Sequence, residues 1–172
     1  MDITRRSLIG AVVAVAPSIA AATDTRPGLR EQLLRAWSLV EAVTIRPNGE
    51  TLPWLGRPGP HTGLIIYAPS GMMSVQIASP RPVAKTPPDI DDMPPAERLK
   101  YLGTYYGYFG RFELDNSKSE VHHIIENSLD PTEVGLVYVR KVALSGGRLT
   151  LTTEPRQIDG EARHNRLIWT RA

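Results

Sequence analysis

The chain has 172 residues, with 20 lysines and arginines against 18 aspartates and glutamates and a formal net charge of +2. So small an excess gives no reason to expect nucleic acid as a partner, and 22% charged and 41% hydrophobic residues exclude a disordered or collagen-like chain. The sequence contains no cysteine, which excludes disulfides, thiolate metal sites and a thiol nucleophile, and its length predicts a single domain.

The first 22 residues have the three parts of an export signal. Arg5 and Arg6 precede an apolar run over 8–16, and small residues end the segment at Ala22. The paired arginines resemble a bacterial twin-arginine signal, while a general export signal and a retained N-terminus are the alternatives. The run is shorter than the ~20 residues of a membrane-spanning helix. We therefore expect a periplasmic or secreted domain over 23–172, with no membrane insertion once the signal is removed.

Most of the remaining chain is predicted to form β-strands. Alternating apolar residues between turn signals predict strands at 37–45, 63–67, 72–78, 108–114, 120–128, 135–144, 149–153 and 166–171. A short helix is expected before them at 29–34, and a helix at 94–102 is expected in the insertion between the third and fourth strands. Eight short antiparallel strands indicate an all-β sandwich or a closed barrel, and closure removes exposed strand edges.

The alternation along the strands also predicts which polar residues face the interior. Side chains on one strand point alternately to opposite faces, so a polar residue in step with apolar ones shares their face. The residues selected in this way are Glu41, Tyr108, His123, Tyr138 and Arg140. A mainly apolar cavity with a few convergent polar groups is typical of a small-molecule site. The alternative is a structural network, in which Glu41 pairs with Arg140 and the tyrosine hydroxyls complete the hydrogen bonding.

The sequence predicts neither a metal site nor a cofactor. His122 and His123 are adjacent on a strand and point to opposite faces, so they cannot hold one ion together. His61 and His164 have no partner at a suitable spacing. The chain also lacks a G-x-S-x-G elbow, a phosphate-binding loop and a dinucleotide fingerprint.

A set of segments in this chain resembles the lipocalin-like domain family of small bacterial and fungal proteins. The segments, in the order typical of that family, are Gly63–Tyr67, Ser70–Gln76, Tyr108–Glu113, Val121–His123, Gly147–Leu151 and Leu167–Arg171. The similarity extends from about Leu29 to Arg171 and implies a calycin-type β-barrel, in agreement with the strand count.

One position departs from the pattern of the lipocalins proper. Arg35 stands where their G-x-W signature has glycine, although Trp37 is present. The resemblance implies that Trp37 packs at the barrel floor against Arg171. Some members of the family look like accessory proteins, cyclases or isomerases of secondary metabolism, so the fold does not decide the function.

Three functions remain open. The first is an exported protein that binds a small hydrophobic or amphipathic molecule in the barrel, with Arg140 and the tyrosines orienting a carboxylate, phenol or ketone. The second is a cofactor-free isomerase, cyclase or dehydratase, with His123 as the general base and Tyr108 or Tyr138 as the acid. In that reaction Arg140 would stabilise an enolate-like oxygen. The third is a structural barrel with a filled interior. We expect the first.

Overall fold

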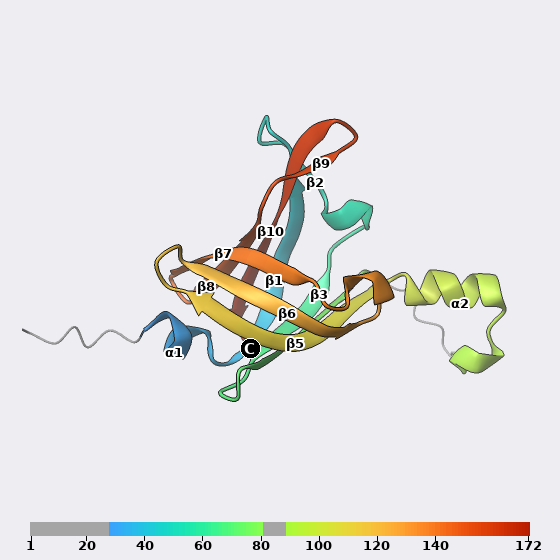
Figure 1. The fold of residues 1–172 in the computed structure, drawn as a ribbon. Coiled ribbons are helices and arrows are strands. Elements are labelled where there is room, and N and C mark those ends of the chain that lie inside the picture. Colours follow the sequence, from blue (N-terminus) through green and yellow to red (C-terminus); the bar gives the residue numbers. More distant parts are fainter. Residues whose placement is uncertain (1–27, 81–88) are drawn as a thin grey trace, which may run out of the picture.

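The computed structural model describes residues 28–80 and 89–172, and the predicted export signal lies outside these residues. Within the described ranges the chain forms ten strands, eight of which close into an antiparallel barrel (Figure 1). The strands are β1 (Ala36–Ile45), β2 (Thr51–Pro53), β3 (Thr62–Tyr67), β4 (Met72–Ala78), β5 (Tyr105–Asp115), β6 (Glu120–Ser128), β7 (Val137–Ser145), β8 (Arg148–Thr153), β9 (Arg156–Ile158) and β10 (Glu161–Arg171). The predicted all-β barrel is confirmed.

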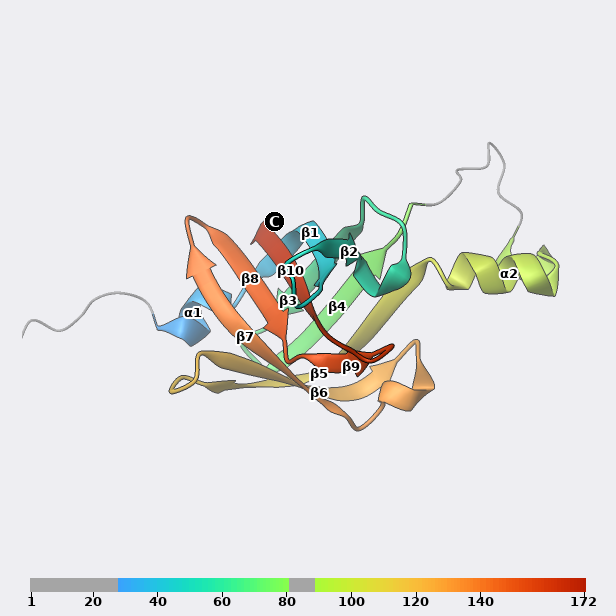
Figure 2. The ribbon, with the colours of Figure 1, turned by 90° about the horizontal axis from the view of Figure 1, so that it is seen from above.

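The helices are short and lie outside the barrel wall. They are α1 (Leu29–Leu33), α2 (Pro95–Leu102) and the 3-10 turns η1 (Trp54–Gly56), η2 (Ile90–Asp92) and η3 (Pro131–Glu133). As predicted, α1 precedes the barrel and α2 lies in the insertion between β4 and β5. Figures 1 and 2 show α2 extending away from the barrel, and none of its residues is buried. In the described part of the chain no helix has the length and apolarity needed to cross a membrane.

Barrel closure comes from pairing between the two ends of the chain. The strands follow the order β1-β3-β4-β5-β6-β7-β8-β10, and β10 pairs with β1 to complete the ring. The register runs from Trp37 opposite Arg171 to Ile45 opposite His164. The short strands β2 and β9 pair with β1 and β10 at one end of the barrel (Figure 1). Neither was predicted, because neither has a buried residue and so neither shows the apolar alternation of a wall strand.

The end of the barrel opposite β2 and β9 is closed by α1. Leu33 and Trp37 are almost completely buried there, and the Trp37 Nε1–H donates to the Leu33 carbonyl oxygen at 3.0 Å. The Arg35 guanidinium carbon lies 5.5 Å from the centroid of the Trp37 ring, a cation–π contact. The arginine in place of the lipocalin glycine therefore packs on the tryptophan of the same motif. Arg171 is the register partner of Trp37 on β10.

A β-bulge in β1 reverses the alternation on which the inward prediction for Glu41 depended. The register with β10 shifts between Leu39 and Glu41. Before the bulge the odd-numbered Trp37 is buried. After it the even-numbered Ala42 and Thr44 are buried, because the extra residue of a bulge reverses which side chains point inward. Glu41 is consequently turned out of the interior, and its side chain is 40% exposed.

A second bulge, in β5, depends on a glycine. The register with β6 shifts between Phe109 and Gly110. A Cβ atom at Gly110 would overlap the Ile124 carbonyl oxygen and lie 2.8 Å from the Glu126 nitrogen, both of them backbone atoms of the neighbouring strand. Only glycine therefore allows β5 and β6 to approach this closely.

We expect Gly110→Ala to lower the free energy of unfolding by about 3 kcal/mol, because two paired strands must separate to admit the methyl group. Gly107→Ala, on the same strand, is the matched control. Its Cβ would meet the flexible Tyr105 ring at 3.1 Å, which can move aside. Urea denaturation of the two variants measures the difference. Equal stability of the two would show that Gly110 is not required by the bulge.

Candidate functional site

The barrel interior contains a cavity of about 190 Å³. Its deep wall includes Ile65, Val75 and Ile77, all nearly fully buried, while Leu55 and Ile158 at the other end are 47% and 40% exposed. The cavity therefore opens at the end of the barrel where β2, η1 and β9 lie. Its volume exceeds the ~150 Å³ of an engineered apolar cavity that binds benzene. The interior is hollow, contrary to the alternative of a filled barrel.

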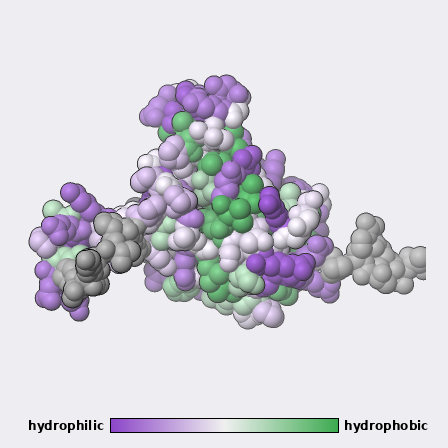
Figure 3. All heavy atoms as spheres, turned by 180° about the vertical axis from the view of Figure 1, so that it is seen from behind, coloured by the Kyte–Doolittle hydropathy of each residue, from purple (hydrophilic) through white to green (hydrophobic). Residues whose placement is uncertain are grey.

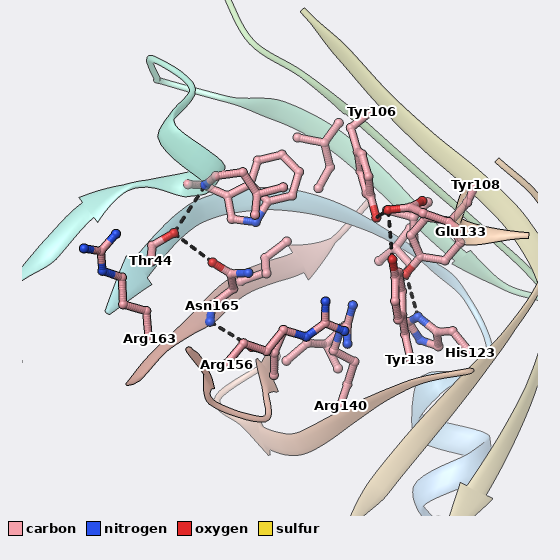
Figure 4. Close-up of a pocket in the computed structure, with 18 of the residues that line it drawn as sticks. Thr44, Tyr106, Tyr108, His123, Glu133, Tyr138, Arg140, Arg156, Arg163 and Asn165 are labelled. Carbon is pink, nitrogen blue, oxygen red and sulfur yellow. Dashed lines mark hydrogen bonds between the residues drawn. The ribbon is translucent and has the colours of Figure 1, made fainter. Parts of the chain in front are cut away.

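Four of the five residues predicted to face the interior line this cavity: Tyr108, His123, Tyr138 and Arg140 (Figure 4). Glu41 does not line it. Its carboxylate instead accepts a hydrogen bond from Arg166 on β10, at 3.0 Å. The Glu41–Arg140 pair of the structural alternative is therefore not formed.

His123 is held between two tyrosine hydroxyls. Its Nε2 is 2.8 Å from the Tyr67 hydroxyl on β3, and its Nδ1 is 2.7 Å from the Tyr108 hydroxyl on β5. Burial is the main cause that lowers the pKa of His123 well below 6.5, followed by the positive charge of Arg140. At neutral pH the ring is therefore uncharged, with one nitrogen donating and the other accepting.

The tyrosines around the cavity are protonated at neutral pH. Burial raises the pKa of Tyr108 to about 12, and the positive charge of Arg140 opposes this rise. Burial, followed by the hydrogen bond to Glu133, raises the pKa of Tyr138 to about 12. Each hydroxyl therefore retains a proton that it can donate.

Glu133 is a cavity residue that the sequence did not indicate. It lies in η3, where Asp130 begins the turn by accepting from the Thr132 backbone N–H at 3.0 Å. The Glu133 carboxylate accepts from three hydroxyls, those of Tyr106 at 3.0 Å, Tyr138 at 2.9 Å and Ser128 at 2.7 Å. Both of its oxygens are engaged, so the carboxylate fixes the tyrosine rings on this side of the cavity.

Two arginines lie against the Tyr138 ring. The guanidinium carbons of Arg140 and Arg156 are 4.7 and 5.6 Å from its centroid, and both side chains line the cavity. Figure 4 shows them reaching toward the same region beside Tyr138. Among the described residues, no carboxylate lies within ion-pair distance of either guanidinium.

The cavity mouth is polar and braced by hydrogen bonds. Thr44 donates to the Asn165 side-chain oxygen at 2.8 Å, which links β1 to β10 at the rim (Figure 4). Arg163 is paired with Glu161 at 2.7 Å, and Glu161 is also paired with Arg46 at 3.0 Å. Figure 3 shows hydrophilic residues gathered at this end of the molecule, where Figure 1 places β2 and β9.

A family model described as a lipocalin-like domain matches residues 36–172, which span all ten strands. The chain belongs to this family. No curated protein and no solved structure shows a significant match. Barrels of the lipocalin type hold one small ligand inside, so membership of the family indicates a fold suited to binding small molecules.

Several residues lining this lipocalin-like cavity were not predicted. They are Thr44, Trp54, Tyr106, Glu133, Arg156 and Asn165. Thr44 was missed because of the bulge in β1. Trp54, Glu133 and Arg156 lie on turns or on a three-residue strand, where alternation gives no signal. Tyr106 shares the parity of Tyr108 and would have been found had β5 been started at Tyr105.

The described residues contain no group of three or more histidine, aspartate or glutamate side chains placed to hold a metal ion. His122 and His123 face opposite sides of β6. His123 is 1% exposed, and the His122 side chain is 30% exposed beside Glu120. The polar side chains that line the cavity of this lipocalin-like barrel include tyrosine, histidine, glutamate and arginine.

The low pKa of His123 predicts that stability falls as the pH falls below 6.5. An unfolded histidine takes up a proton near pH 6.5, whereas the buried ring does not, so protons favour the unfolded state. We expect the free energy of unfolding to fall as the pH drops below ~6.5, with a slope that rises toward a limit of about 1.4 kcal/mol per pH unit. Denaturation at a series of pH values measures the slope, and His123→Gln should flatten it.

His61→Gln is the control, because burial also lowers the pKa of His61. His61 is less buried than His123, so its substitution should flatten the slope less. The carboxylates whose pKa is lowered, such as Asp115 and Glu161, add their effect only near and below pH ~4. An unchanged slope in His123→Gln would show that His123 does not remain neutral in the folded protein.

Proposed function

We propose that this protein is exported and binds one small, mainly apolar molecule in its barrel cavity. The observation that carries the proposal is the uneven lining of the cavity. The apolar residues deep in the cavity come from β3, β4, β8 and β10, and the phenol and imidazole groups of Tyr108, His123 and Tyr138 come from the adjacent strands β5, β6 and β7. The guanidinium groups lie on β7, β9 and β10, and those on β9 and β10 are at the mouth. A molecule with one polar end and one apolar end fits such a site in a single orientation.

The size of the cavity limits the ligand. About 190 Å³ exceeds the ~150 Å³ that holds benzene but lies below the ~300–1,000 Å³ typical of sites for drug-sized molecules. The proposed ligand therefore has one or two rings, or a similarly compact skeleton. Burying it would be favourable because each buried CH₂ contributes about 0.8 kcal/mol.

The geometry supports binding more than catalysis by His123. Both nitrogens of the imidazole are bonded to tyrosine hydroxyls, so neither is free to take a proton from a bound molecule. His123 instead orients the Tyr108 hydroxyl, which lines the cavity. In an isomerase or cyclase, Tyr108 would be the group that meets the substrate and His123 would position it.

We expect one- and two-ring aromatic compounds to bind with a stoichiometry of one and to remain chemically unchanged. Isothermal titration with a panel that includes indole, 2-naphthol and benzoate measures binding, and mass spectrometry of the recovered compound detects turnover. Native mass spectrometry of protein from its own host would reveal a co-purified molecule. If no compound of this size binds, the proposal is wrong; a recovered product would favour the isomerase or cyclase.

Leu151→Phe should weaken this binding, because Leu151 is 3% exposed and lines the cavity, so that a larger side chain takes space from the ligand. Leu144→Phe is the matched control, since Leu144 packs on the core but does not line the cavity. Equal binding by the two variants would place the ligand elsewhere.

Export is supported by the pattern of the first 22 residues. We expect the protein in the periplasmic or secreted fraction, shortened near Ala22. Replacing Arg5 and Arg6 together by lysine should retain the full-length precursor in the cytoplasm if the twin-arginine route is used. Fractionation and mass measurement test this, and unaltered export of the double variant would indicate a general export signal.

A further inference from the structure

The pair of cavity arginines, Arg140 and Arg156, is the feature that the proposed function leaves unexplained. Both guanidinium groups lie against one face or edge of the Tyr138 ring, and both line the cavity. Two like charges brought together in a partly apolar site repel one another, and cation–π contact with a single ring compensates only part of that cost. Such an arrangement is complementary to an anion.

The other charged groups of the cavity wall do not neutralise this pair. Glu133 is the nearest candidate, but its two oxygens accept from the hydroxyls of Tyr106, Tyr138 and Ser128 rather than from a guanidinium. Arg163, the third arginine of the lining, has carboxylate partners of its own in Glu161 and Asp159. Of the three arginines that line the cavity, Arg140 and Arg156 are therefore the two without a carboxylate partner among the described residues.

The two arginines differ in depth, which places the anion along the cavity axis. Arg140 lies on the barrel strand β7, is partly buried, and donates to the Val139 carbonyl oxygen at 2.9 Å through one nitrogen. A second hydrogen bond, to Tyr108, opposes the rise in the pKa of that tyrosine. A guanidinium has five N–H donors, so donors remain for an anion. Arg156 lies on β9 at the mouth and is exposed. An anionic group between them would sit at the entrance side, with the rest of the molecule directed inward.

We infer that the ligand is a small aromatic carboxylate, held through its carboxylate by Arg140 and Arg156 and through its ring by the aromatic wall. This inference rests on the proposed function and names the ligand class for the same cavity. A carboxylate fits because it is planar and matches the fork of N–H donors on a guanidinium.

The aromatic wall of the cavity is complementary to the ring of the inferred ligand. The aromatic side chains that line it are Trp54, Tyr106, Tyr108, Tyr138 and Trp169. Edge-to-face contacts already link several of them, such as Tyr108 with Tyr138 at a centroid separation of 5.9 Å. The Nε1–H of Trp169 has no acceptor among the described residues, but it is buried within the wall.

The test compares two ligands of nearly equal shape that differ in charge. Titration of the purified protein with benzoate and with benzamide should give tighter binding of benzoate by at least about tenfold, since hydrogen bonds to charged groups contribute more than neutral ones. Arg156→Gln and Arg140→Gln should each remove most of that preference while leaving benzamide binding little changed. Arg156→Gln is expected to fold normally, because Arg156 is exposed on β9.

Arg148→Gln, at the opposite end of the barrel in the β7–β8 hairpin, is the control and should retain the preference. Equal binding of benzoate and benzamide overturns the inference but leaves the proposed function standing. A preference that survives both cavity substitutions overturns the assignment to Arg140 and Arg156. If neither compound binds, and no other one- or two-ring compound does, both the inference and the proposed function are wrong.

Discussion

The antiparallel pairing of β1 with β10 closes the barrel, and the cavity exists because of this closure. The chain has no cysteine, so non-covalent contacts join β1 to β10: hydrogen bonds, packing and the ion pairs Arg46–Glu161 and Arg166–Glu41. The contacts are far apart in sequence, as in the bond between Thr44 and Asn165, which are separated by 121 positions. Because such long-range pairings form at a high cost in chain entropy, the ring is stable only when the whole wall is in place. The cavity is therefore a property of the complete domain.

Inside the barrel, the polar side chains complete their hydrogen bonds in networks of several residues. Each nitrogen of His123 is hydrogen-bonded to a tyrosine hydroxyl, and the Glu133 carboxylate accepts hydrogen bonds from three hydroxyls. In a medium of low dielectric constant, such complete networks are rigid, whereas a single unpaired member would be destabilising. Arg140 and Arg156 differ from these groups, since both lie against the Tyr138 ring and neither has a carboxylate partner among the described residues. The contrast separates the groups that hold the wall in place from those that are free to meet a ligand.

Alternation along the strands predicted the fold and most of the interior, and it failed where the backbone departs from regular geometry. The eight wall strands and the inward position of His123 follow from period-two patterning, which burial imposes directly. Glu41 was misplaced because a bulge inserts one residue, and nothing in the local sequence marks a bulge in β1. Glu133 and Arg156 reach the cavity from segments outside the wall strands, and tertiary packing alone positions them.

The location of Arg156 separates the charge at the cavity entrance from the stability of the fold. It lies on β9, a three-residue strand that is exposed throughout and pairs only with β10. A substitution there removes an exposed charge and its contact with the Tyr138 ring but no buried side chain. A change at His123 or Tyr108 disturbs the core itself. In evolutionary terms, the charge at the cavity entrance can drift by point mutation at the rim while the barrel stays under constant selection for folding.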